Sequence, residues 1–171
     1  MFSSCTSLTT IPQLDTSKGT NFSYMFSNCS SLTTVPQLDT SKGTDLSSMF
    51  LNSRNLKRIE GISFKSLNKT VNNSYLTGAG YREHLRYVLI KDIGTCTGMT
   101  SINFTNWNVW GENDETTTDA RQSLVDSLLT YSFDRATAGY STCTISLYGS
   151  TKALLTADEI AQITAKGYTI A

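Results

Sequence analysis

The chain is poor in charged side chains and has almost no histidine. Only 16% of its 171 residues are charged, 14 basic side chains balance 14 acidic ones, and the one histidine is His84. A nucleic-acid partner needs clustered lysines and arginines to neutralise its phosphates, so the composition argues against that class of partner. No C-x-x-C pair occurs, and a zinc site is therefore not expected either.

Long apolar runs are also absent. No segment reaches the ~18 consecutive apolar residues that a membrane-spanning helix needs. Because Met1 already stands at the first position of a repeat, we expect no secretory signal peptide within these residues, and residues 1–8 show no pattern typical of a capping unit. We therefore expect the sequence to be a piece of a longer chain, and the uncapped first coil offers a route to self-association.

The residues of an active site are missing as well. His84 stands alone between two arginines, and the motifs of α/β-hydrolases, phosphate-binding loops and zinc proteases do not occur. The sequence predicts no enzyme, no cofactor and no metal.

One acidic run needs a separate interpretation. Glu112, Asp114 and Glu115, with Asp119 nearby, could hold calcium, but their spacing does not match an EF-hand loop. A solvated acidic loop before a helix N-terminus explains the run better.

What the chain does contain is a repeat. Residues 1–24 and 25–48 are identical at 18 of 24 positions. A period of this length is typical of a solenoid, in which successive coils stack and share one core.

Each copy predicts a strand, a turn and a short helix. Leu8 and Ile11, like Leu32 and Val35, have the spacing of a short strand that enters the core. Each strand is expected to end near the following proline, which cannot donate to a ladder. A hydroxyl N-cap, Thr20 in the first copy, then precedes apolar residues at helical spacing and predicts one or two helical turns.

The repeat pattern resembles a known family. Repeats of the form MF-x-x-C-x-x-L-x-x-(I/V), followed by an LDTS segment and a T-x-(F/L) helix start, are similar to the BspA-like leucine-rich-repeat surface proteins of host-associated bacteria. The similarity is close over residues 1–62 and degraded beyond. It implies a non-catalytic bacterial module, secreted or displayed on the cell surface, that binds a host or matrix protein or a glycan in adhesion.

We expect one α/β leucine-rich-repeat domain over residues 1–171, with roughly seven parallel strands on one face and short helices on the other, lengthening toward the C-terminus. Its predicted divisions are repeats at 1–24, 25–48 and 49–76, degenerate coils at 77–116, and C-terminal coils at 117–171. Further strands are predicted at 85–91 and 99–104, at the alternating residues 143, 145 and 147, and at 168–170. A helix is predicted at 118–132, with Leu124, Leu128 and Tyr131 on its apolar face. Another should open at the capping box of Thr156 and Glu159.

Repetition should align the outward residues of the strands into two columns. The first column is Thr10, Thr34, Arg58, Tyr87, Ser101 and Thr144, and the second is Pro12, Pro36, Glu60, Leu89, Asn103 and Ser146. The candidate partner-binding residues are Arg58, Glu60, Tyr87, Lys91, Asn103 and Trp110, since aromatic and arginine side chains anchor many interfaces. The alternatives are a merely solvated sheet face and a structural spacer in a larger surface or phage-like protein.

The cysteines and tryptophans leave further alternatives. Cys5 and Cys29 take the same place in successive copies, where stacked coils would allow a disulfide, but their side chains should point in parallel. We expect a buried pair of free thiols. Trp107 is expected to cap the core, whereas Trp110 could equally contact a partner.

Overall fold

A computed structural model describes residues 1–67, 87–95, 99–104, 117–147 and 149–171. The chain is a mixed α/β protein with parallel strands, as the sequence predicts. In order, its elements are β1 (Thr34–Val35), β2 (Arg58–Ser63), β3 (Tyr87–Lys91), β4 (Ser101–Phe104), α1 (Thr117–Val125), η2 (Asp126–Thr130), β5 (Cys143–Leu147), α2 (Gly149–Lys152), α3 (Ala157–Ala165) and β6 (Tyr168–Ile170).

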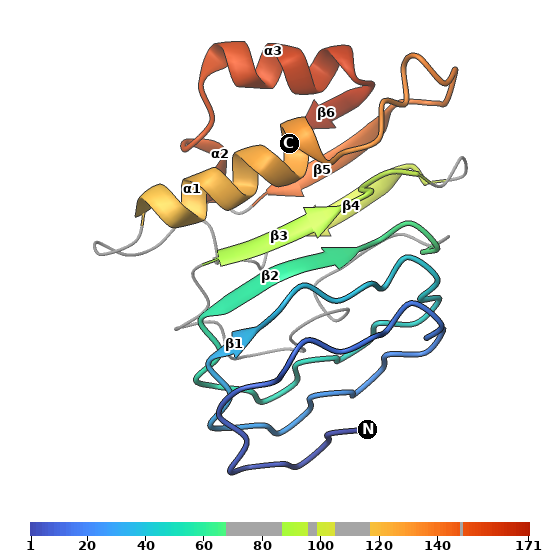
Figure 1. Ribbon diagram of the computed structural model, residues 1–171. Coiled ribbons are helices and arrows are strands. Elements are labelled where there is room, and N and C mark those ends of the chain that lie inside the picture. The colour runs from blue at the N-terminus through green and yellow to red at the C-terminus, as the bar shows by residue number, and fades with distance from the viewer. Residues whose placement is uncertain (68–86, 96–98, 105–116, 148) are drawn as a thin grey trace.

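Successive copies of the 24-residue repeat lie on one another in register (Figure 1). The backbone N–H of Phe2 donates to the carbonyl of Met25 and that of Phe26 donates to Met49, both at 2.9 Å. The rings of Phe2, Phe26 and Phe50 form one stack, with centroids 5.4 and 5.7 Å apart. Equivalent residues therefore meet from copy to copy, as the repeat predicts.

The short helices expected within the repeats are not formed. Residues 21–28 and 45–52 are successions of turns. Tyr24 and Asn28 have φ values of 54° and 58°, in the left-handed region, and a right-handed helix cannot continue through such residues. Their N–H groups donate to the next copy instead, Tyr24 to Ser47 at 3.1 Å and Asn28 to Leu51 at 2.7 Å. Bonding between copies replaces bonding within a helix.

The threonines expected as helix caps do not act as caps. Asn21, rather than Thr20, closes the turn by accepting from the N–H of Ser23 at 2.9 Å. Thr44 instead binds the preceding copy, because its N–H and its Oγ1 both lie within hydrogen-bond distance of the Thr20 carbonyl, at 2.8 and 3.1 Å.

The strands lie in two sheets, β1-β2-β3 and β4-β5-β6, and not in one continuous ribbon as expected. The edge of β3 that faces away from β2 is covered by α1 and η2. The N–H of Val88 donates to Ser123 Oγ at 3.4 Å, and that of Ile90 donates to Ser127 Oγ at 3.0 Å. Two serines therefore occupy the positions that a neighbouring strand would take, and the first sheet ends there.

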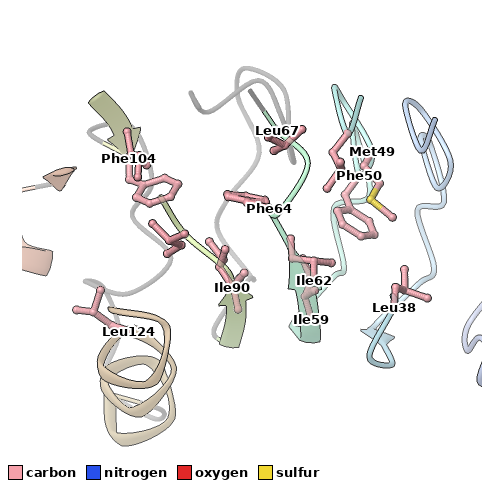
Figure 2. Close-up of a cluster of buried hydrophobic side chains, with 14 of the residues drawn as sticks. Leu38, Met49, Phe50, Ile59, Ile62, Phe64, Leu67, Ile90, Phe104 and Leu124 are labelled. Carbon is pink, nitrogen blue, oxygen red and sulfur yellow. The ribbon is translucent and has the colours of Figure 1, made fainter. Parts of the chain in front are cut away.

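One hydrophobic core nevertheless runs beneath both sheets. Figure 2 shows its side chains in a row, from Leu38 and Phe50 through Ile62 to Ile90 and Leu124. The core is thus shared along the described length of the chain.

A buried arginine links the segment that follows β3 to the segment that precedes β4. Arg135 is fully buried and donates to the carbonyls of Gly94 at 2.6 Å, Met99 at 2.9 Å and Ser141 at 2.9 Å. A buried guanidinium is tolerated when its donors meet acceptors in this way. Sequence reasoning missed this residue, since one arginine in a loop is usually solvated.

The C-terminal elements follow the prediction closely. Thr156 Oγ1 accepts from the N–H of Glu159 at 3.2 Å, and Glu159 Oε2 accepts from the N–H of Thr156 at 2.8 Å, which completes the capping box of α3. Gly167, with a φ of 90°, lies in the turn between α3 and β6.

The cysteines of the described residues are free, and only part of the expectation holds. Cys29 is buried, whereas Cys5 is exposed, so the expected burial holds for Cys29 alone. Several other predictions concern residues outside the described part of the chain, namely His84, Cys96, Trp107, Trp110 and the acidic residues 112–115.

Candidate binding surface

The register of the strands brings the first predicted column together within each sheet. Thr34 pairs with Arg58, and Arg58 pairs with Tyr87. In the second sheet Ser101 pairs with Thr144. The alignment of these residues is confirmed, but the column is divided between two sheets.

Arg58 is the centre of the candidate surface. Its Nε donates to Glu60 Oε1 at 2.9 Å, and its guanidinium carbon lies 4.1 Å from the centroid of the Tyr87 ring. The Arg58 and Glu60 side chains are 35% and 39% exposed, so this ion pair adds little to stability. A cation over a tyrosine contributes about 0.5–1 kcal/mol at such a site. The contacts bring the three side chains together at the surface.

Lys91 makes a similar cation–ring contact with Tyr131, which the sequence placed on the buried face of a helix. Its Nζ lies 5.0 Å from the centroid of the Tyr131 ring. Tyr131 is 39% exposed, so its prediction as part of the buried face with Leu124 and Leu128 is wrong. The helix passes into the wider π-turn of η2 before Tyr131, and this extra residue per turn changes the direction of the following side chain.

Tyr87 and Lys91 begin and end β3, so the Arg58–Glu60–Tyr87 contacts and the Lys91–Tyr131 contact lie along one strand. The N–H of Tyr131 donates to the carbonyl of Asp126 at 2.9 Å. Burial, followed by the nearby carboxylate of Glu60, raises the pKa of the Tyr87 hydroxyl above its ordinary value, and Arg58 partly offsets this increase. Asp126 and Tyr131 add smaller contributions in the same direction as Glu60. The cluster therefore contains two tyrosines, two cations and two carboxylates. We call these six residues, Arg58, Glu60, Tyr87, Lys91, Asp126 and Tyr131, the tyrosine–cation cluster.

The second predicted column is interrupted. Ile59 pairs with Val88 and Ile62 pairs with Ile90, so Glu60 and Gly61 together oppose Leu89 in a β-bulge. Leu89 is only 7% exposed, and its predicted place on the open face is wrong.

Asn103 lies apart from the cluster. It is exposed on β4 and pairs with Ser146 in the second sheet. The structure does not bring it together with Arg58 or Lys91, and Trp110 lies outside the described residues.

A separate pocket of about 280 Å³ lies at the N-terminal end of the stack. Its lining includes Thr16, Gly19, Phe22 and Met25, and Met1 beside it is 96% exposed. The pocket lies on the first copy of the repeat, and the self-association expected from the sequence stays a prediction.

The described residues hold neither a metal-ligand cluster nor a helix able to span a membrane. No group of three or more potential metal ligands occurs among the described residues. In the same part of the chain, no helix has both the length and the apolar character needed to cross a membrane.

Comparison with known proteins relates the repeat region to one family. Residues 1–79 match the model of a family described as "Mycoplasma protein of unknown function, DUF285". The matched stretch contains both near-identical copies and the whole of the third repeat, 49–76. No curated protein and no solved structure matches the chain.

Proposed function

We propose that the chain is a non-catalytic binding module of a leucine-rich-repeat solenoid, of the BspA-like kind, secreted or displayed on the surface of a host-associated bacterium. Its role is adhesion to a host or matrix protein or glycan through the open face of the first sheet. The tyrosine–cation cluster is the observation that carries this proposal. Aromatic and arginine side chains are the usual anchors of interfaces, and here strand register gathers them at one place.

The solenoid itself is supported by the contacts between repeats. Thr33 N donates to Thr9 O at 3.3 Å and Lys57 N donates to Thr33 O at 2.8 Å, each bond spanning one repeat. Stacked coils of this kind leave a long exposed surface, which repeat proteins use for binding.

The proposal is tested by the binding of labelled protein to host cells and to immobilised extracellular-matrix proteins. We expect Arg58→Ala and Tyr87→Ala to reduce binding at least tenfold, because each removes one partner of the contact that positions the other. Lys42→Ala, a change of an exposed residue in the second repeat, is the matched control and should bind as well as the unchanged chain. Binding that is equal for all three variants would contradict the proposal.

A structural spacer is the second candidate, and the near identity of residues 1–24 and 25–48 favours it. An array that only sets a distance needs repeats that stack uniformly, and the regular bonds between copies supply this. A spacer would tolerate both substitutions in every adhesion assay.

A further inference from the structure

We propose that the tyrosine–cation cluster binds a neutral glycan, an oligosaccharide with vicinal hydroxyl groups; this inference rests on the proposed binding function and names its ligand. The chemistry of the cluster separates this ligand from an anionic chain and from an apolar partner.

The charge balance of the cluster argues against a polyanion. The cluster has two cations, Arg58 and Lys91, and two carboxylates, Glu60 and Asp126, and the whole chain has a net charge of zero. A sulfated or phosphorylated chain would need an excess of cations to release its counterions. Without such an excess, long-range attraction of a polyanion is not available.

The surface is equally unsuited to an apolar helix or strand. Among the described residues, the exposed large hydrophobic side chains are Met1, Tyr24 and Tyr131, of which only Tyr131 belongs to the cluster. A helix that docks through its apolar face needs a row of such side chains.

A neutral sugar matches what the cluster offers. Tyr131, a residue that is 39% exposed, has a ring that presents apolar area with a hydroxyl at its end, and such a ring can pack against the C–H face of a hexose. The ammonium of Lys91, 5.0 Å from the ring centroid, can donate to hydroxyl oxygens. The carboxylates of Glu60 and Asp126 can accept from hydroxyl groups. A vicinal diol both donates and accepts, so it can use both kinds of group, and bonds to charged partners are the stronger ones.

The column extends this surface toward the repeats. Thr34 pairs with Arg58 and is half-buried, which leaves a hydroxyl-bearing residue in line with the cluster. A linear oligosaccharide could therefore lie across the strands, from the cluster toward the second repeat.

The test is calorimetric titration of the full chain with soluble neutral hexasaccharides of glucose (β1,4- and α1,4-linked) and mannose, all of which carry vicinal hydroxyl groups. Sialyllactose and a heparin hexasaccharide serve as acidic probes. We expect one neutral probe to bind with a dissociation constant of about 1 mM or lower, nearly independent of salt between 50 and 200 mM. Binding only to the acidic probes, with a steep salt dependence, would overturn the inference, as would failure of every probe.

Variants then locate the site. Tyr131→Ala should weaken binding at least tenfold and Tyr131→Phe by less than threefold, because the phenylalanine keeps the ring. Lys91→Gln should weaken binding several-fold without affecting the ring. Tyr24→Ser is the control, since Tyr24 is an exposed tyrosine outside the cluster and serine stands at the equivalent position of the next copy, Ser48. Equal affinity for Tyr131→Ala and the unchanged chain would overturn the inference, provided that both show the same unfolding transition.

The two proposals fail in different ways. If binding to host cells depends on Arg58 but survives periodate oxidation of the cell-surface sugars, the ligand is a protein and the glycan inference is wrong, while the binding function stands. If no variant changes adhesion and no probe binds, both proposals are wrong.

Discussion

Cys29 and Ser53 make the same hydrogen bond one coil apart. Cys29 Sγ donates to the carbonyl of Phe2 at 3.0 Å, and Ser53 Oγ donates to the carbonyl of Phe26 at 2.7 Å, each to a residue 27 positions earlier. Both side chains are buried, and both reach the coil before their own. The position therefore requires a small hydrogen-bond donor, and a thiol or a hydroxyl can fill it.

Cys29→Ser should leave stability nearly unchanged, because serine already fills this place in the third coil. Burial raises the pKa of the Cys29 thiol, so the group stays protonated and donating at neutral pH. We expect a change in the free energy of unfolding below about 1 kcal/mol for serine and a loss of about 1 kcal/mol for Cys29→Val, which removes one of two donors to the Phe2 carbonyl, the other being the N–H of Cys5 at 3.3 Å. Urea denaturation measures both. A serine variant as unstable as the valine variant would contradict the shared role.

Ser127→Ala should weaken the end of the first sheet. The change leaves the buried N–H of Ile90 without its acceptor, at a cost of about 1–3 kcal/mol. Amide hydrogen exchange at Ile90 should become faster, and the unfolding midpoint should fall. Thr130→Ala, at an exposed position of the same π-turn, is the control. Unchanged protection of Ile90 would show that the serine does not close this edge.

The repeat period makes the candidate surface predictable in part. The 24-residue period predicts that Thr34 and Arg58 share one column, and the same frame with five inserted residues adds Tyr87; strand register bears this out. The α3 capping box is equally visible in the sequence, because both of its hydrogen bonds join residues three apart. A capping box can be predicted from the sequence because both of its hydrogen bonds form within one helical turn and need no residue distant in the chain.

The rest depends on contacts that have no local signal. The pattern at Phe22, Met25 and Phe26 has helical spacing, but the positive φ of Tyr24 turns the backbone toward the next copy, and tertiary bonding prevails over local preference. The bulge that buries Leu89 and the exposure of Tyr131 each follow from one extra residue in a strand or helical turn. No composition or periodicity reports such insertions.

Arg135→Ala should be among the most damaging single changes in the chain. It would leave the carbonyls of Gly94, Met99 and Ser141 without the Arg135 donor and open a cavity where the guanidinium lies. We expect a loss of at least ~3 kcal/mol, because a buried network is broken. Arg135→Lys should recover only part of the loss, since an ammonium cannot match the planar fork of the guanidinium. Thermal unfolding measures both, with Lys42→Ala as an exposed control; a loss below about 1 kcal/mol for alanine would contradict this role.

Glu159→Gln should lower stability only where the carboxylate is charged. Hydrogen bonds from Thr156, and then the ion pair with Arg121 at 2.6 Å, hold the pKa of Glu159 below its ordinary value. A lowered pKa gives stability that is present above the ordinary pKa and is lost as the pH falls through the lowered one. We expect the variant to be about 0.5–1 kcal/mol less stable at pH 7 and equal to the unchanged chain near pH 2. Urea denaturation across this range checks the sign, and a difference that grows toward acid pH would contradict it.

A further copy of residues 25–48, inserted after Ser48, should be accepted by the fold and should stabilise it. The new coil would continue the phenylalanine stack and the backbone bonds that already join each copy to the next. In a repeat array the free energy of unfolding rises with each added interface, and the m-value rises with the added buried surface, here by about a seventh for 24 residues added to 171. A glycine–serine insert of the same length at the same place is the control and should lower the unfolding midpoint. If both inserts destabilise the chain equally, the copies are not interchangeable coils. In that case the spacer function loses its support, while the tyrosine–cation cluster remains testable by its own variants.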